Sequence, residues 1–320
     1  MRLDLVWFGL MISGINAQGV DLGGGILTRT DVEQYADIAL DIRDIRELVA
    51  ANDGDAALER YTEGHNSNIQ PGVKFTVQKM TTDLQKLART VQTPNYLFHL
   101  YGLADREVTK LDPTYADNFA LTSIRPDSKI AADSLLALHS WMYATHVLSH
   151  GVDICYKLTI ADNPDLFHLG GGGMDEFIAL WIGKDQTVGS MDGHGLYALA
   201  QRAAELFNTV NLQRPEAPVN TNIKLLYQSG AMTLALPNSC TRGNDESVRT
   251  LWTTAQHIIS QMYVPLIQML IDALYRHDTQ AISLYALAIV PQTAQCRPSV
   301  YKKLKEELID GTISISRIDE

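Results

Sequence analysis

The sequence predicts an all-α protein, a multi-helix globular domain whose two ends carry related helical patterns. Three observations lead to this fold class. Apolar residues recur at helical spacing along almost the whole chain, and the alternating pattern of strands is hard to find. A length of 320 residues with 46% hydrophobic residues is sufficient for a large buried core.

The first element, "MRLDLVWFGLMISGINAQG", has the pattern of a secretory leader. A single Arg precedes an apolar run from Leu5 to Ile15, and Ala17 is a small residue at which a signal peptidase could cut. The run is too short to span a bilayer. We therefore predict a signal peptide at residues 1–17 and an exported helical domain at 18–320. A buried N-terminal strand or helix is the alternative.

The elements that follow are all read as helices, because each shows continuous helical spacing of its apolar residues. Gly64 is expected to end the second of them. Pro265 should kink the longest, since proline lacks the N–H group and its ring crowds the preceding turn. The predicted helices cover residues 31–52, 55–64, 73–92, 114–123, 128–158, 174–183, 193–208, 221–234, 245–277, 279–290 and 298–308.

Two stretches resemble each other and suggest an internal repeat. "IRELVAANDGDAALERY" ends at Tyr61 and "IDALYRHDTQAISLY" ends at Tyr285, each with a helix, a polar turn and Ala-x-x-x-Tyr. A loop with a proline and a basic amphipathic helix follow each tyrosine. The sequence therefore offers residues 31–125 and 245–310 as two repeats, with a ligand cleft between the halves. Packing alone can also make helix–turn–helix segments alike.

The charge balance argues against nucleic acid as a partner. The chain has 26 basic and 37 acidic residues and a net charge of −11, which repels a polyanion and tolerates cations. No second apolar run of about 18 residues lacks charges, so we expect no transmembrane anchor. Uptake of a bound cargo would then need a separate membrane partner.

The three cysteines match no zinc-binding spacing. In an exported protein one pair can form a disulfide and leave one thiol buried. Cys240 and Cys296 flank the long C-terminal helical segment, so we expect the bond between them and a free thiol at Cys155.

One predicted helix carries a stripe of metal-binding side chains. In "LHSWMYATHVLSHG", His139, Tyr143, His146 and His150 follow at steps of four, three and four, which places them on one helix face. Imidazole nitrogen and phenolate oxygen can bind a metal ion, and His146 and His150 have the separation that lets both reach it. The alternative is a polar seam satisfied by hydrogen bonds to neighbouring helices.

A glycine-rich loop precedes the predicted helix 174–183. Gly171, Gly172 and Gly173 leave free backbone N–H groups at a helix start, where anions are attracted. These glycines are therefore the candidate anion site.

Four further residues around this loop are candidate ligands. Asp175 and Glu176 lie in the first helical turn, where capping of the helix dipole is the alternative role. His194 and Tyr197 follow in "DGHGLYALAQ", three apart and pointing the same way.

The stretch "MDEFIALWIGKDQTVGSMDGHGLYALAQRAAELF" resembles the low-iron-inducible periplasmic, iron-assimilating proteins of algae and the related phytotransferrins. "DIRDIRELVAANDGDAALERYTEGHNS", "PTYADNFA" and "VPLIQMLIDALY" are similar to them as well, so the resemblance runs from about residue 31 to 305. It implies a secreted protein of the periplasmic space, cell wall or cell surface that captures ferric iron, with carbonate as a synergistic anion. The chain departs from membrane-anchored members because no hydrophobic tail follows "LIDGTISISRIDE".

The chemistry agrees with this resemblance, since hard ferric iron suits phenolate and carboxylate oxygen and tolerates imidazole. We therefore expect a non-catalytic ferric iron-binding protein that uses Fe³⁺ and carbonate. Two alternatives stay open: a metal-dependent hydrolase or oxidase, and a cell-wall interaction protein. The sequence contains no phosphate loop, no dinucleotide fingerprint and no nucleophile elbow. The expected metal ligands are Tyr143, His146, His150, Asp175, Glu176, His194 and Tyr197.

Overall fold

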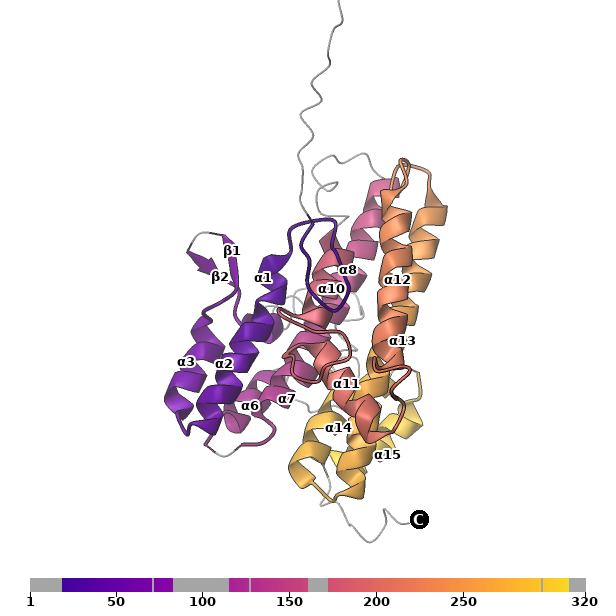
Figure 1. The fold of residues 1–320 in the computed structure, drawn as a ribbon. Helices are drawn as coiled ribbons and strands as arrows, with labels where there is room; N and C mark the ends of the chain where they lie inside the picture. Colours follow the sequence, from indigo (N-terminus) through magenta and orange to yellow (C-terminus); the bar gives the residue numbers. More distant parts are fainter. Residues whose placement is uncertain are drawn as a thin grey trace, which may run out of the picture.

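The computed structural model describes residues 19–70, 72–82, 115–126, 128–160, 172–294 and 296–310. These residues form a helical protein with one small hairpin, which confirms the predicted all-α class (Figure 1). The predicted signal peptide at residues 1–17 lies outside them. The elements are α1 (Glu33–Ala36), α2 (Ile38–Ala50), α3 (Gly54–Glu63), β1 (Asn68–Gln70), β2 (Val73–Lys74), α6 (Tyr115–Ser123), α7 (Ala131–Ser134), the π-helical turn Leu135–Ser140, α8 (Trp141–Ile160), α10 (Gly172–Ile182), α11 (Leu196–Leu206), α12 (Pro218–Ala235), α13 (Asp245–Tyr275), α14 (Thr279–Thr293) and α15 (Pro298–Leu308).

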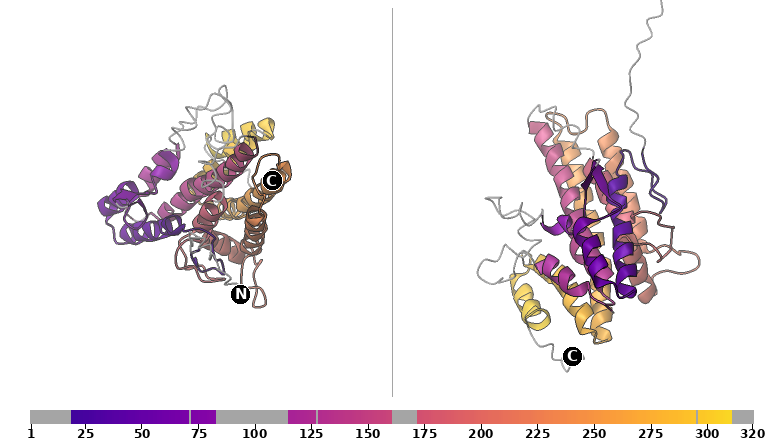
Figure 2. Two further views of the ribbon diagram at one scale, coloured as in Figure 1. Left: turned by 90° about the horizontal axis from the view of Figure 1, so that it is seen from above. Right: turned by 90° about the vertical axis from the view of Figure 1, so that its left-hand side faces the viewer.

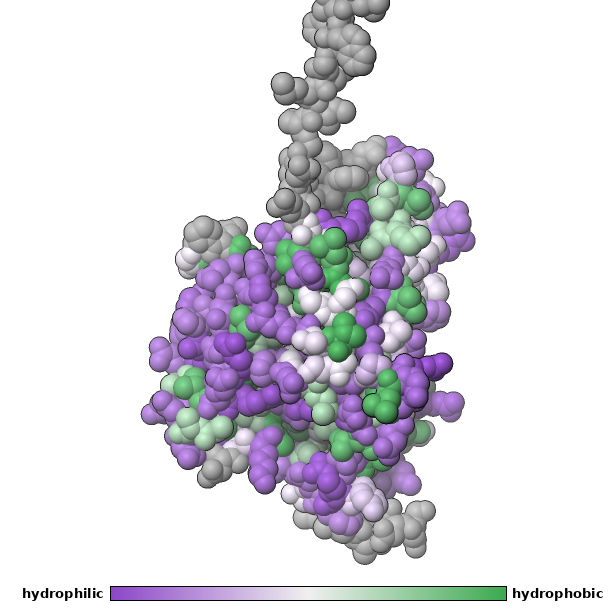
Figure 3. All heavy atoms as spheres, in the orientation of Figure 1, coloured by the Kyte–Doolittle hydropathy of each residue, from purple (hydrophilic) through white to green (hydrophobic). Residues whose placement is uncertain are grey.

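The N-terminal helices α1, α2 and α3 form one side of the molecule. Asp53 caps α3 by accepting a hydrogen bond from the Ala56 N–H (3.1 Å), and Gly64 ends that helix with a positive φ, as predicted. The surface over α2 and α3 is mostly hydrophilic in Figure 3. Their apolar faces pack inward, with Ile42, Ile45 and others in the core.

The predicted helix 73–92 is wrong in its first part. Val73 and Lys74 pair with β1 in an antiparallel hairpin, whose turn includes Gly72 at a φ of 79°. Glycine adopts this left-handed conformation without a steric penalty, so the turn forms where the sequence suggested a helix start. Helical backbone begins at residue 79, and residues 83–92 lie outside the described part of the chain.

Helices α8 and α10 cross closely at the centre of the fold. A Cβ atom built on Gly173 of α10 would lie 2.7 Å from the Cα of Gly151 on α8 and 2.6 Å from the carbonyl oxygen of Val147. Only glycine leaves room for two backbones at this distance, so Gly151 and Gly173 set the crossing of the two helices. In the right-hand view of Figure 2 the N-terminal helices lie in front and the long C-terminal helices lie behind.

The C-terminal half is built on α13, which packs against α8, α11, α12 and α14. Asn244 caps α13 through the N–H of Ser247 (3.2 Å), and Asp278 caps α14 through the N–H of Ala281 (3.1 Å). These caps define two separate helices where the sequence has an almost continuous apolar pattern. Whether this half repeats residues 31–125 stays a prediction.

The disulfide joins Cys155 of α8 to Cys240, which follows α12. The expected bond between Cys240 and Cys296 is therefore wrong, and the exposed Cys296 is the free thiol. Sequence position alone favoured the wrong pair, because it does not show that the end of α8 lies beside the α12–α13 connection.

Among the described residues, α13 alone has the length and composition that could cross a membrane. In this fold it packs against four other helices and contributes Ile258, Met262 and Leu266 to the core. The expected lack of a membrane anchor stays a prediction.

Candidate functional site

Three of the predicted ligands form a row of rings along α8. The rings of Tyr143 and His146 have centroids 5.9 Å apart, and His146 stacks on His150 at 5.6 Å with an interplanar angle of 14°. Phe75 contacts the other end of the row, 5.0 Å from Tyr143. His150 is exposed, whereas Tyr143 and His146 are half-buried. The predicted helix face therefore exists over these three residues.

A carboxylate connects to this row through Tyr35, which the sequence analysis did not identify. The Tyr35 hydroxyl lies beside the carboxylate of Glu176, and its ring packs edge-on against Phe75 at 5.7 Å. Helices α1 and α10 pack together and thus hold Tyr35 beside Glu176. The described residues therefore link a carboxylate, two phenols and two imidazoles through consecutive contacts.

At pH 7 the neutral imidazole of His146 and the mostly ionised carboxylate of Glu176 can each donate an electron pair to a metal ion. Burial, with a contribution from His150, lowers the pKa of His146 to about 4, so its imidazole is neutral at pH 7. Burial raises the pKa of Glu176 to about 6, and the neighbouring Asp175 adds to that effect. Burial and Glu176 raise the pKa of Tyr35 well above its usual value. A bound cation would be needed to release the proton of Tyr35 near neutral pH.

Asp175 has a structural role in the fold. Its Oδ2 accepts hydrogen bonds from the backbone N–H groups of Arg29 (3.1 Å) and Thr30 (2.9 Å) and from the Thr30 hydroxyl (2.8 Å). Its Oδ1 accepts one from the Tyr227 hydroxyl at 2.7 Å. The side chain is 1% exposed, so these four bonds occupy a fully buried carboxylate and attach the N-terminal loop to α10 and α12.

The candidate anion loop is only partly described. Gly171 lies outside the described residues, whereas Gly172 and Gly173 are already the first residues of α10. The close approach of α8 explains the glycine at 173 without any ligand. The anion-binding role of this loop stays a prediction.

His194 lies in a positively charged environment. Nη1 of Arg46 donates to its Nδ1 at 3.3 Å, so this nitrogen accepts from a guanidinium. Burial lowers the pKa of His194 to about 4, followed by repulsion from Arg46, Arg43 and Arg202. The same repulsion acts on any metal cation, so the surroundings of His194 favour anions.

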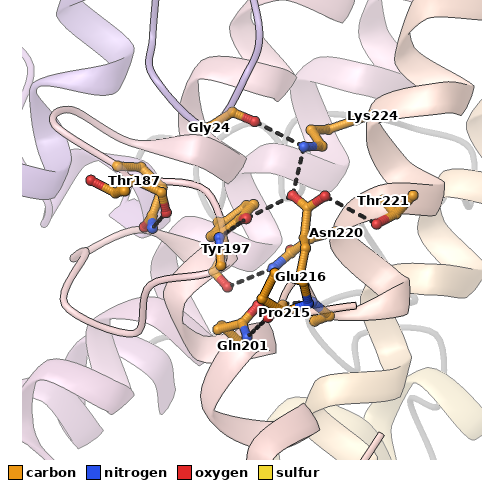
Figure 4. A network of polar contacts seen from close by, with 12 residues as sticks. Gly24, Thr187, Tyr197, Gln201, Pro215, Glu216, Asn220, Thr221 and Lys224 are labelled. Carbon is orange, nitrogen blue, oxygen red and sulfur yellow. Dashed lines mark hydrogen bonds and ion pairs between the residues drawn. The ribbon is translucent and has the colours of Figure 1, made fainter. Parts of the chain in front are cut away.

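Tyr197 belongs to a polar network that joins three loops (Figure 4). Its hydroxyl donates to Oε1 of Glu216 at 2.6 Å and accepts from the Gly189 N–H at 2.9 Å. Lys224 forms an ion pair with the same Oε1 at 2.6 Å and donates to the Gly24 carbonyl at 2.9 Å. The Tyr197 hydroxyl thus already donates to one protein group and accepts from another.

His139 is turned away from the α8 row. It lies in the π-helical turn Leu135–Ser140, whose wider winding changes the angular position of residue 139 relative to residue 143. Its Nε2 lies 2.9 Å from the hydroxyl of Tyr61, which donates to Asp117 at 2.6 Å. The stripe predicted over four residues therefore holds for three.

Within the described ranges, no group of three or more His, Cys, Asp or Glu side chains is arranged to hold a metal ion. The predicted ligands lie in different neighbourhoods. Tyr143, His146 and His150 form the α8 row, and Glu176 approaches it through Tyr35 and Phe75. Any metal site in the described structure would therefore need ligands of another kind as well, and phenol oxygens are the ones that the α8 row offers.

Comparison of the chain with protein-family models, curated proteins and solved structures finds no match.

Proposed function

We propose that the protein binds ferric iron outside the cell, in the neighbourhood of Tyr35, Tyr143, His146, His150 and Glu176, which we call the phenol–imidazole cluster. The observation that carries the proposal is the position of the Glu176 carboxylate beside the Tyr35 hydroxyl, next to the ring row of α8. It supports the presence of hard oxygen donors and neutral imidazole nitrogen in one half-buried region, which is the donor set that Fe³⁺ prefers.

The charge of the protein also favours a cation as cargo. The net charge is −11, and Tyr35 lies beside the carboxylate that could accept its proton. When a trivalent ion displaces the proton of the phenol, the cation compensates the negative charge that burial otherwise disfavours. Because burial disfavours the anionic forms of Tyr35 and Glu176, an ion of high positive charge should stabilise them more than one of low charge. Carbonate remains the proposed synergistic anion.

The test is a titration of the purified protein with ferric nitrilotriacetate in bicarbonate buffer at pH 7.5. A tyrosinate-to-iron charge-transfer band should grow in the visible spectrum and saturate. Tyr35→Phe retains the ring packing against Phe75 and removes the hydroxyl, so it should lose most of the band. Tyr275→Phe is the matched control, because Tyr275 is 84% exposed and lies outside the phenol–imidazole cluster.

The band should also weaken as the pH falls through about 6, where Glu176 gains its proton. A protein that stays colourless and leaves the iron with the chelator would contradict the proposal. Equal bands in the wild type and in Tyr35→Phe would remove Tyr35 from the site.

A further inference from the structure

A pocket of about 340 Å³ lies between α2, the start of α7 and α11, apart from the phenol–imidazole cluster. Its charged lining consists of Arg46 from α2, Lys129 and Asp133 around the start of α7, and Arg202 from α11. Three cationic side chains thus face one carboxylate in a protein whose overall charge is strongly negative. This local excess of positive charge is the opposite of what chance placement would give.

Asp133, the only carboxylate among the described residues that line the pocket, already accepts hydrogen bonds with both oxygens. Asp133 Oδ1 accepts from Nη2 of Arg202 at 2.6 Å, and its Oδ2 accepts from the hydroxyl of Tyr285 at 3.1 Å. Among the described residues, Arg46 makes no salt bridge, and its one side-chain hydrogen bond goes to the neutral imidazole of His194. The buried Nε of Arg202 has no hydrogen-bond partner in the described structure. Guanidinium donors therefore remain available beside the pocket.

Without a bound anion, the positive charge of Arg46 is destabilised in this pocket. Burial and the neighbouring Arg202 lower the pKa of Arg46, which means that its charge is disfavoured where it stands. Burial acts on Arg202 in the same direction, but Asp133 outweighs it and raises the pKa of Arg202. An oxyanion between the two guanidinium groups would supply the missing opposite charge, and its oxygens match the planar donors of arginine.

The rest of the wall is apolar and favours an organic ligand. Val49, Ala50 and Ala132 line the pocket together with the charged groups. Small-molecule sites commonly combine such an apolar wall with a few polar groups that orient the ligand. A bare inorganic ion would leave the apolar wall without a contact.

We propose that this pocket binds a small organic oxyanion, a carboxylate or a phosphate monoester with a compact apolar body, whose charged oxygens contact Arg46 and Arg202. Lys129 adds long-range attraction from the exposed rim. The site is independent of the proposed iron site, so either can fail without the other.

The test is isothermal titration calorimetry of the full chain with benzoate and phenyl phosphate, in a low-salt buffer without phosphate. Benzamide, which has the same ring without the charge, should bind about tenfold more weakly than benzoate or worse, because it loses the charge-assisted hydrogen bonds. Inorganic phosphate should also bind more weakly than phenyl phosphate, since it leaves the apolar wall uncovered. The stronger of the two organic anions identifies the headgroup.

Two variants and one control locate the binding. Arg46→Gln should weaken the stronger ligand about tenfold or more. Arg43→Gln, in the same helix, should bind as the wild type, because Arg43 pairs with Asp44 and does not line the pocket. Ala50→Leu should also weaken binding, since Ala50 lies on the exposed end of α2 and a larger side chain fills the pocket without changing any charge.

Circular dichroism and thermal unfolding show whether each variant is folded. If Arg46→Gln does not fold, Ala50→Leu still tests whether the ligand occupies the pocket. The proposal is overturned if neither organic anion binds, or if both arginine variants weaken binding equally. It is also overturned if Ala50→Leu binds as tightly as the wild type.

Discussion

The phenol–imidazole cluster includes His146, and His194 contacts Arg46 of the pocket between α2, α7 and α11, which we call the arginine pocket. The two histidines have similarly lowered pKa values but opposite surroundings. The pKa of His146 and that of His194 both fall to about 4, and burial is the largest cause in each. The second cause differs. For His146 it is the neighbouring His150, in a region that also contains Glu176 and two phenols, whereas for His194 it is three arginines.

The difference teaches that a depressed histidine pKa does not by itself indicate a metal ligand. A neutral imidazole can bind a cation only if its other neighbours tolerate positive charge. The ring of His146 contacts the phenol of Tyr143, and among the described residues no cation lowers its pKa except the neighbouring His150, while Nδ1 of His194 already accepts from Arg46. The two regions should therefore take ligands of opposite charge.

The largest expected effect is the loss of stability when the disulfide that anchors α8 is removed. The disulfide between Cys155 and Cys240 closes a loop with a sequence separation of 85 residues. The double variant Cys155→Ala/Cys240→Ala should lower the free energy of unfolding by about 4 kcal/mol. Urea denaturation measures this loss. Cys296→Ala should change stability little because Cys296 is exposed and unpaired, and a large loss there would contradict the assignment of the bond.

The next two predictions distinguish the roles of Asp175 and Glu176, which are adjacent in α10. Asp175→Asn replaces a buried carboxylate that accepts four hydrogen bonds. We expect a loss of about 3 kcal/mol in the free energy of unfolding, because the amide presents donors where only acceptors fit. Chemical denaturation at pH 7 checks it, and a neutral result would mean that Asp175 is free for another role.

Glu176→Gln should act in the opposite direction. The folded protein raises the pKa of Glu176 from 4.5 to about 6, so the folded state keeps a proton that the unfolded chain has lost. Stability therefore falls as the pH rises through this interval, and removal of the charge should stabilise the protein at pH 7 by about 1–2 kcal/mol. At pH 4 the variant and the wild type should be equally stable.

Glu205→Gln, at an exposed position of α11, is the matched control for this change and should differ from the wild type by little at either pH. A destabilised Glu176→Gln variant at pH 7 would indicate that Glu176 is needed for the fold and not held ready for a ligand.

The smallest expected effect is a change in the pKa values of His146 and His194, which tests directly whether their surroundings differ. Arg46→Gln should raise the pKa of His194, because it removes a positive charge beside the ring, and should leave the pKa of His146 unchanged. His150→Gln should raise the pKa of His146 alone. Imidazole resonances followed by NMR against pH measure both, and a shared response would mean that the two regions are coupled.

Much of the fold could be predicted from the sequence, because helical periodicity is a local property. The ranges predicted for α3, α11, α13 and α15 agree with the structure to within a few residues. The hairpin at Val73 and Lys74 could not be distinguished from a basic amphipathic helix by periodicity alone. The π-helical turn was also invisible, since one change of winding leaves the apolar pattern of the flanking helix intact.

The candidate sites were predictable only where they depend on a single helix. The row Tyr143, His146 and His150 follows from spacing on α8. The partner of Glu176 does not, because Tyr35 is distant in sequence and no local motif connects the two. The arginine pocket likewise depends on the packing of α2, α7 and α11, and none of its residues stands out in its own segment.

The most direct test of the opposite ligand preferences is the ferric charge-transfer band measured in parallel for Tyr35→Phe and Arg46→Gln. We predict that Tyr35→Phe loses most of the band and that Arg46→Gln keeps the intensity of the wild type. A band that persists in Tyr35→Phe and disappears in Arg46→Gln would place the cation among the arginines and contradict the account.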